Sequence, residues 1–119
     1  MKNQVCSKEQ MEELVKFGVD VSSASMCYVK TGCTGNMLRI NNEDYYGIIY
    51  PTFTVVDMLN LMPKNINDYY FEFTMGSPSY YSCRYFSSYT ENELYFSEEE
   101  SIIDAVYNTF LQLAKASKL

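Results

Sequence analysis

The stretch YYFEFTMGSPSYYSCRYF, residues 69–86, decides the fold class of this chain. In its first half, Tyr69, Phe71 and Phe73 alternate with residues that are mostly polar, which is the period of a strand with one apolar face. A Gly-Ser-Pro-Ser turn follows, and residues 80–86 then alternate again, less cleanly. The stretch therefore predicts two antiparallel strands joined by a turn.

A helix is predicted after these strands, and it completes the unit. A short third strand at residues 93–96 leads to Ser97 and Glu100, which have the spacing of a capping box. The Glu-Glu-Glu run inside that box would place negative charge at the positive end of the helix. The apolar face that follows predicts a helix to about residue 116, packed across the sheet.

Two further helix starts precede the strands. Ser7 with Gln10, and Thr54 with Asp57, each form a capping signature before an apolar stripe. Gly18 is a plausible left-handed stop for the first helix, and the proline after LNLM ends the second. From the second start onward we expect the order helix, three antiparallel strands, helix.

The region between the first two helices is less regular. Residues 26–30 predict a short strand, and residues 37–40 and 45–50 flank an Asn-Asn-Glu-Asp turn at 41–44 that is typical of a hairpin. The Gly, Ser and Asn content of the region is also compatible with a mobile loop. The fold class is therefore α+β in a single domain, residues 1–119, with an N-terminal helix and an irregular or hairpin region over 1–51 and an αβββα unit over 52–119.

Charge and hydropathy argue against several classes of partner. Nine basic and 15 acidic residues among 119 give a net charge of −6, which repels phosphate backbones and anionic membrane surfaces. Basic proteins are the partners that this charge favours. The chain has no apolar run long enough to span a bilayer and no export signal near its start, so we expect a cytoplasmic protein.

The cysteines and the missing histidine bear on metal and catalytic sites. Cys27 and Cys33 are separated by five residues, outside the usual spacing of a structural zinc site, and the chain has no histidine. We expect reduced thiols at Cys6, Cys27, Cys33 and Cys83, although two disulfides are an alternative. No metal and no cofactor are expected.

Acidic residues and glycines provide no recognisable catalytic pattern either. Glu98, Glu99 and Glu100 are explained by the predicted helix start, and Glu43 and Asp44 by the predicted turn. A nucleophilic serine or cysteine lacks the histidine that usually activates it. We therefore expect that the protein is not an enzyme.

Aromatic residues are the most suggestive feature of the sequence. The chain has 12 Tyr and 7 Phe, and many of them lie between residues 69 and 89. One face of the sheet has to cover the helices, and the other would present an amphipathic patch of the kind found at protein interfaces. The alternative is a sheet covered on both sides, with the N-terminal region as the second layer.

The candidate interaction surface comprises Tyr70, Tyr80, Arg84, Phe86 and Tyr89. Replacing Tyr80 and Tyr85 by Ser is expected to weaken association and preserve the fold.

The order of elements from residue 54 to 116 is similar to that of the double-stranded RNA-binding domain. That family binds phosphates with a basic cluster at the start of its last helix, where this chain has Glu98, Glu99 and Glu100. The resemblance therefore implies a related topology without direct nucleic-acid binding.

Short segments carry a second resemblance. They are YPTFT at residues 50–54, LNLMPK at 59–64, IDAV at 103–106, and the EQ and FGVD pieces at 9–10 and 17–20. Together they resemble small uncharacterised proteins of gut Bacteroidetes and their phages. This resemblance implies an accessory protein of a mobile element and carries no known activity or functional residue.

Three functional hypotheses follow. The leading one is a non-enzymatic protein–protein interaction module whose Tyr-rich sheet binds a protein partner or a second copy of the chain. The second is an acidic inhibitor that mimics nucleic acid by charge, which needs carboxylates clustered on one face. The third is a weak carboxylate-dependent hydrolase, which needs two acids facing each other in a pocket.

Overall fold

A computed structural model describes residues 5–31, 35–41, 48–76 and 80–119 of the chain. Within these ranges it contains three helices and two antiparallel sheets, so the predicted α+β class is confirmed. The helices are α1 (Lys8–Lys16), α2 (Val55–Leu61) and α3 (Ile102–Lys115). The strands are β1 (Met26–Thr31), β2 (Gly35–Ile40), β3 (Ile48–Thr52), β4 (Asn65–Ile66), β5 (Tyr69–Gly76), β6 (Tyr80–Phe86) and β7 (Glu93–Glu99).

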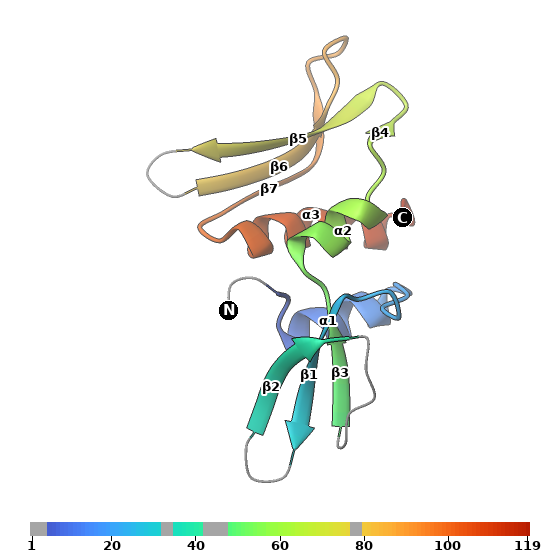
Figure 1. Cartoon of the computed structure of the whole chain (residues 1–119). Coiled ribbons are helices and arrows are strands. Elements are labelled where there is room, and N and C mark those ends of the chain that lie inside the picture. The colour runs from blue at the N-terminus through green and yellow to red at the C-terminus, as the bar shows by residue number, and fades with distance from the viewer. Residues whose placement is uncertain (1–4, 32–34, 42–47, 77–79) are drawn as a thin grey trace.

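The described elements form layers around α3 (Figure 1). The four-stranded sheet β4-β5-β6-β7 lies on one side of α3, α2 packs beside it, and α1 lies on the other side. The three-stranded sheet β2-β1-β3 extends from α1 away from the four-stranded sheet. The molecule is consequently elongated, with extents of 55 × 33 × 20 Å.

Both early helix starts are confirmed. The Ser7 hydroxyl accepts a bond of 3.1 Å from the Gln10 N–H, and the Gln10 side chain accepts one of 2.9 Å from the Ser7 N–H. Thr54 and Asp57 exchange the same pair of bonds, at 3.1 and 2.9 Å. Gly18 follows α1 with a φ of +85°, the left-handed conformation that ends many helices.

The start of α3 corrects a sequence prediction. The helix begins at Ile102 with Ser101 as its cap, so the predicted capping box of Ser97 and Glu100 is wrong. Ser97 instead lies in β7, where it pairs with Cys83 of β6, and its buried hydroxyl donates to the Ala105 carbonyl at 2.5 Å. This packing of β7 on α3 outweighs the local capping signature. Two of the three glutamates, Glu98 and Glu99, consequently extend the strand, and neither they nor Glu100 lie in the first helical turn.

The four-stranded sheet contains one strand more than predicted. The short strand β4 pairs with the start of β5, Asn65 with Tyr70 and Ile66 with Tyr69. The predicted strands at 69–75 and 80–86 are found and pair in antiparallel register without a bulge. Two residues are too few to produce an alternating pattern, which explains why β4 is not predicted.

The strand order of the N-terminal sheet also differs from the predicted hairpin. The predicted strand segments 26–30 and 37–40 are found, but β3 pairs with β1, which lies between β2 and β3. The segments at 37–40 and 45–50 therefore do not form a hairpin with each other. Residues 42–47, which include most of the predicted turn, lie outside the described residues.

The core lies where α3 faces the four-stranded sheet, α2 and α1. Phe53 and Phe110 meet edge to face with ring centroids 5.9 Å apart. The largest fully buried hydrophobic side chains are contributed by several elements and their connections: Leu14, Phe53, Met58, Tyr85, Val106, Phe110 and Leu113. The described helices pack on one face of the four-stranded sheet and leave its other face uncovered.

Candidate interaction surface

Strand alternation separates the two faces of the four-stranded sheet. On β6, Cys83 and Tyr85 are fully buried toward α3, whereas Arg84 and Phe86 lie on the opposite, outer face. On β5, Tyr70 pairs with Phe86 and therefore shares the outer face. Helix α1 and the three-stranded sheet lie beyond α3, so no described element covers this outer face (Figure 1).

An ion-paired arginine occupies the middle of the outer face. The Arg84 Nε atom lies 2.9 Å from a carboxylate oxygen of Glu72 on β5, and its Nη1 atom lies 3.0 Å from one of Glu93 on β7. The guanidinium carbon lies 4.2 Å from the centroid of the Phe86 ring. The hydrogen bonds that Arg84 donates to Glu93 and to Glu72 raise the pKa of its guanidinium, with Glu93 the larger cause. These contacts hold a long side chain in one orientation.

We define the outer patch as Tyr70, Glu72, Arg84, Phe86 and Glu93. The register places these residues on three adjacent strands, because Tyr70 pairs with Phe86, Glu72 with Arg84, and Phe86 with Glu93. Tyr70 is 60% exposed, so its ring is available to a partner. The patch therefore combines exposed aromatic surface with fixed charges, as protein interfaces do.

The remaining two predicted surface residues lie apart from the outer patch. Tyr80 begins β6, four residues before Arg84, which corresponds to about 13 Å along a strand. Tyr89 lies in the turn between β6 and β7 and is 85% exposed. The structure thus brings together three of the five predicted residues, Tyr70, Arg84 and Phe86.

Tyr85 is a core residue, which corrects the substitution proposed from the sequence. Its side chain is fully buried and its hydroxyl donates to the Pro63 carbonyl at 2.6 Å. Its ring also packs on Phe71, with centroids 5.5 Å apart. Replacing Tyr85 by Ser would damage the fold, so Tyr80 and Tyr85 are a poor pair for testing association. The alternation along β6 was sufficient to place Tyr85 with Cys83 on the inner face.

Sequence reasoning missed the acidic residues of the patch. Glu72 and Glu93 are each far from Arg84 in sequence and reach it only through the strand pairing. Phe96, which is 44% exposed, follows the bulge of β7 and alternates with the inward Ser97. Identifying Glu72 and Glu93 as neighbours of Arg84 requires the register in which the strands pair. The periodicity of the sequence alone does not give that register.

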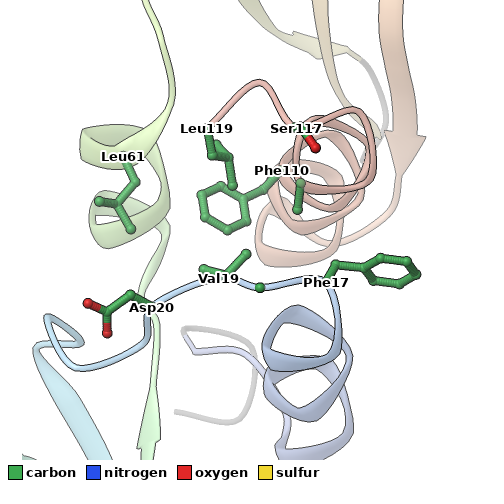
Figure 2. A pocket seen from close by; sticks show the side chains of 9 residues that line it. Phe17, Val19, Asp20, Leu61, Phe110, Ser117 and Leu119 are labelled. Atoms are coloured by element: carbon green, nitrogen blue, oxygen red, sulfur yellow. The ribbon is translucent and has the colours of Figure 1, made fainter.

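A cavity of about 370 Å³ lies away from the sheet, between α1, α2 and α3. Figure 2 shows Val19, Leu61, Phe110 and Leu119 around the same space, whereas Phe17 points away from it. The side chains that face this space are mainly apolar. The cavity offers no pair of facing carboxylates of the kind that a hydrolase needs.

A second hollow, of about 550 Å³, lies at the junction of β7 and α3. Two of its carboxylates already have partners in the protein, because Glu99 accepts from Asn108 at 2.8 Å and Asp104 accepts from Gln10 at 2.9 Å. The residues lining it are Tyr80, Glu98, Glu99, Glu100, Ser101 and Asp104. Glu72 and Glu93 are not among the residues that line this hollow, because their carboxylates bind Arg84.

The described cysteines are buried and unbridged, and Cys33 lies outside the described residues. Burial raises the pKa of Cys6 and Cys83 to about 12, with the charges of Asp104 and Asp57 contributing at Cys6. Such thiols are poor nucleophiles because the thiolate is the reactive form. The part of the chain that the structure describes also holds no group of three or more metal-ligating side chains.

Comparisons with known proteins name no relative. No protein family, curated protein or solved structure matches this chain. Across the described residues, none of the helices has the length and apolar character needed to cross a membrane. The function therefore has to be argued from the geometry of the outer face.

Proposed function

We propose that this protein is a non-enzymatic interaction module that binds another protein through the outer patch. The proposal includes an origin in a phage or another mobile element, which the resemblance of its short segments to small Bacteroidetes and phage proteins implies. It also includes action in the cytoplasm without a metal, a cofactor or direct contact with nucleic acid. The observation that carries it is the uncovered sheet face where Tyr70 and Phe86 flank the ion-paired Arg84.

The outer patch is suited to binding because its side chains are already ordered. Arg84 is held by two carboxylates and by the Phe86 ring, so little rotamer entropy remains to be lost when a partner binds. Tyr70 adds a large contact area with two rotatable side-chain angles. Aromatic and arginine side chains of this kind are the residues that most often dominate binding energy at interfaces.

Charge indicates the chemistry of the partner. The patch has two carboxylates, Glu72 and Glu93, for one guanidinium, and the whole chain has a net charge of −6. A partner segment with basic and aromatic side chains would complement both the charge and the exposed rings. We therefore propose a basic protein segment as the ligand of the outer patch.

Selection from a display library of random peptides tests this function. Peptides enriched on the wild-type protein should contain Arg or Lys beside aromatic residues. Their dissociation constants should rise about tenfold or more for the double variant Tyr70→Ser and Phe86→Ser, because large aromatic contacts would be lost. Circular dichroism would check that the variant remains folded.

The matched control removes exposed apolar side chains from another surface. Val56 and Leu59 on α2 are 63% and 38% exposed, so the pair Val56→Ser and Leu59→Ser changes a similar kind of residue away from the sheet. Its affinity for the same peptides should equal that of the wild type. Equal loss in both double variants, or peptides without basic residues, would argue against the proposal.

A further inference from the structure

Strand β5 has an open edge along its second half. Strand β4 pairs only with Tyr69 and Tyr70, and the Phe71 N–H donates to the Lys64 carbonyl at 3.1 Å. Beyond Phe71, no described residue pairs with β5 on this side. Figure 1 shows the same arrangement, with β4 beside one end of β5 and the arrowhead end free.

The backbone groups at this edge can be assigned from strand geometry. The N–H of Phe71 points toward β4, and the N–H and C=O groups of every second residue of a strand point to the same side. The backbone groups of Phe73 and Met75 therefore point away from β6, toward the open edge. Both residues are exposed, at 38% and 71%, and so are Thr74 and Gly76.

This edge lacks the features that usually prevent pairing. Proteins protect sheet edges with proline, lysine or bulges. The edge strand β3 contains Pro51, and the edge strand β7 has a bulge next to Tyr95, whose φ is +56°. The open β5 segment from Glu72 to Gly76 contains no proline or lysine, and its pairing with β6 shows no bulge. Its one charged residue, Glu72, is paired with Arg84 of the same chain.

We infer that β5 pairs with β5 of a second copy of this chain, forming a symmetric dimer whose continuous sheet has β5, β6 and β7 of each copy side by side. The open segment runs from residue 72 to residue 76, so an antiparallel pairing that uses all of it places the two-fold axis at Thr74. In this register Phe73 pairs with Met75 of the second copy, and each pair exchanges two backbone hydrogen bonds. The open backbone groups of Phe73 and Met75 thereby all find partners.

The side chains are self-complementary in the same register. Glu72 faces Gly76 of the second copy, so the two Glu72 carboxylates do not oppose each other. Phe73 lies beside Met75 of the second copy, a favourable sulfur–aromatic pairing. Phe73 also stacks on Tyr81 with centroids 6.2 Å apart, so each copy contributes a preformed apolar cluster. A shift of the axis to Phe73 would require the Phe71 N–H, which is already bonded to Lys64.

The dimer contact and the outer patch share one residue, Glu72, and are otherwise separate. The dimer contact uses the edge of β5, whereas the outer patch lies on the face of the sheet. Pairing would make the outer faces of both copies continuous, so that one assembly presents two patches. Variants of the patch, such as Tyr70→Ser with Phe86→Ser, should therefore leave the oligomeric state unchanged.

Sedimentation velocity of the full chain tests the inference. The wild-type protein should be a dimer, and Met75→Lys should weaken dimerisation about tenfold or more, because a lysine at the edge disfavours strand pairing. Val56→Lys adds the same charge at a site of similar exposure on α2 and should sediment as the wild type does. A monomeric wild type, or equal weakening by both lysines, would overturn the inference.

A cross-link tests the register directly. Thr74→Cys would place two thiols at the two-fold axis, where facing residues of this kind have Cα atoms about 4.5 Å apart. Mild oxidation should yield a covalent dimer for Thr74→Cys and only wild-type background for Thr90→Cys in the exposed β6–β7 turn. Cross-linking of both variants to the same extent would exclude the proposed register.

Discussion

At the residue scale, the Tyr85 hydroxyl is a small group with a defined structural role. It donates to the carbonyl of Pro63, which follows α2, and so joins the α2–β4 connection to β6. Tyr85→Phe would keep the buried ring and leave that carbonyl without this partner. We expect the free energy of unfolding to fall by about 1 to 2 kcal/mol, as measured by urea denaturation.

Tyr81→Phe is the matched control for this substitution. Tyr81 also lies on β6 and on the inner face, but it is only partly buried. Its stability should change by no more than about 0.5 kcal/mol. If the two variants are equally stable, the Pro63 bond contributes nothing measurable.

At the element scale, Asp57 connects the start of α2 to the N-terminal sheet. One of its carboxylate oxygens accepts from the Thr54 N–H at 2.9 Å, the Ser25 hydroxyl at 2.8 Å and the Ser25 N–H at 3.1 Å. Asp57→Ala removes one of the two bonds of the capping box, the one that the Thr54 N–H donates, together with this connection. We expect a loss of about 2 kcal/mol in the free energy of unfolding, measured by thermal and urea denaturation.

Glu9→Ala provides the comparison for Asp57→Ala. Glu9 is an acidic residue in the first turn of α1, where Ser7 and Gln10 form the capping box without it. The helix dipole alone would make this substitution cost about 0.5 kcal/mol. A similar loss in both variants would mean that the Ser25 connection adds nothing to ordinary helix-end electrostatics.

The elements that sequence predicts well are those specified by neighbours along the chain. The caps at Ser7 and Thr54 need residues only three positions away, and both are present as predicted. The same local signature at Ser97 is wrong because β6 pairs with the backbone at Ser97 and a carbonyl of α3 accepts from its hydroxyl. The pairing of β3 with β1 rather than β2 likewise depends on tertiary packing, and the alternation of residues along a strand does not predict which strand it pairs with.

Prediction of the candidate surface from sequence has the same limit, because only local patterns can be read along the chain. Alternation along β5 and β6 is sufficient to place Tyr70, Arg84 and Phe86 on one face. The contacts of Arg84 with Glu72 and Glu93 depend on register, and the exposure of the face depends on where α1 lies. Sequence therefore predicts which residues could form a surface, whereas their partners require the assembled sheet.

At the scale of the whole molecule, burial around α3 makes stability sensitive to alkaline pH. Burial raises the pKa of Tyr85 and Tyr107 from 10.0 to about 12, and that of Cys6 and Cys83 from 9.0 to about 12. In the unfolded chain these groups lose their protons at lower pH than in the folded protein. Their contribution to stability is therefore complete below about pH 9 and is lost as pH rises toward 12.

Urea denaturation at about pH 8 and about pH 11 would measure this loss, and salt would identify its cause. A chain that already has a net charge of −6 also repels itself more strongly as its net charge becomes more negative at high pH. Added salt screens that repulsion but does not make a buried phenolate or thiolate favourable. The alkaline loss should consequently persist at high salt and be smaller in Tyr85→Phe, which has one buried ionisable group fewer. Complete recovery of stability by salt would assign the loss to surface charge instead.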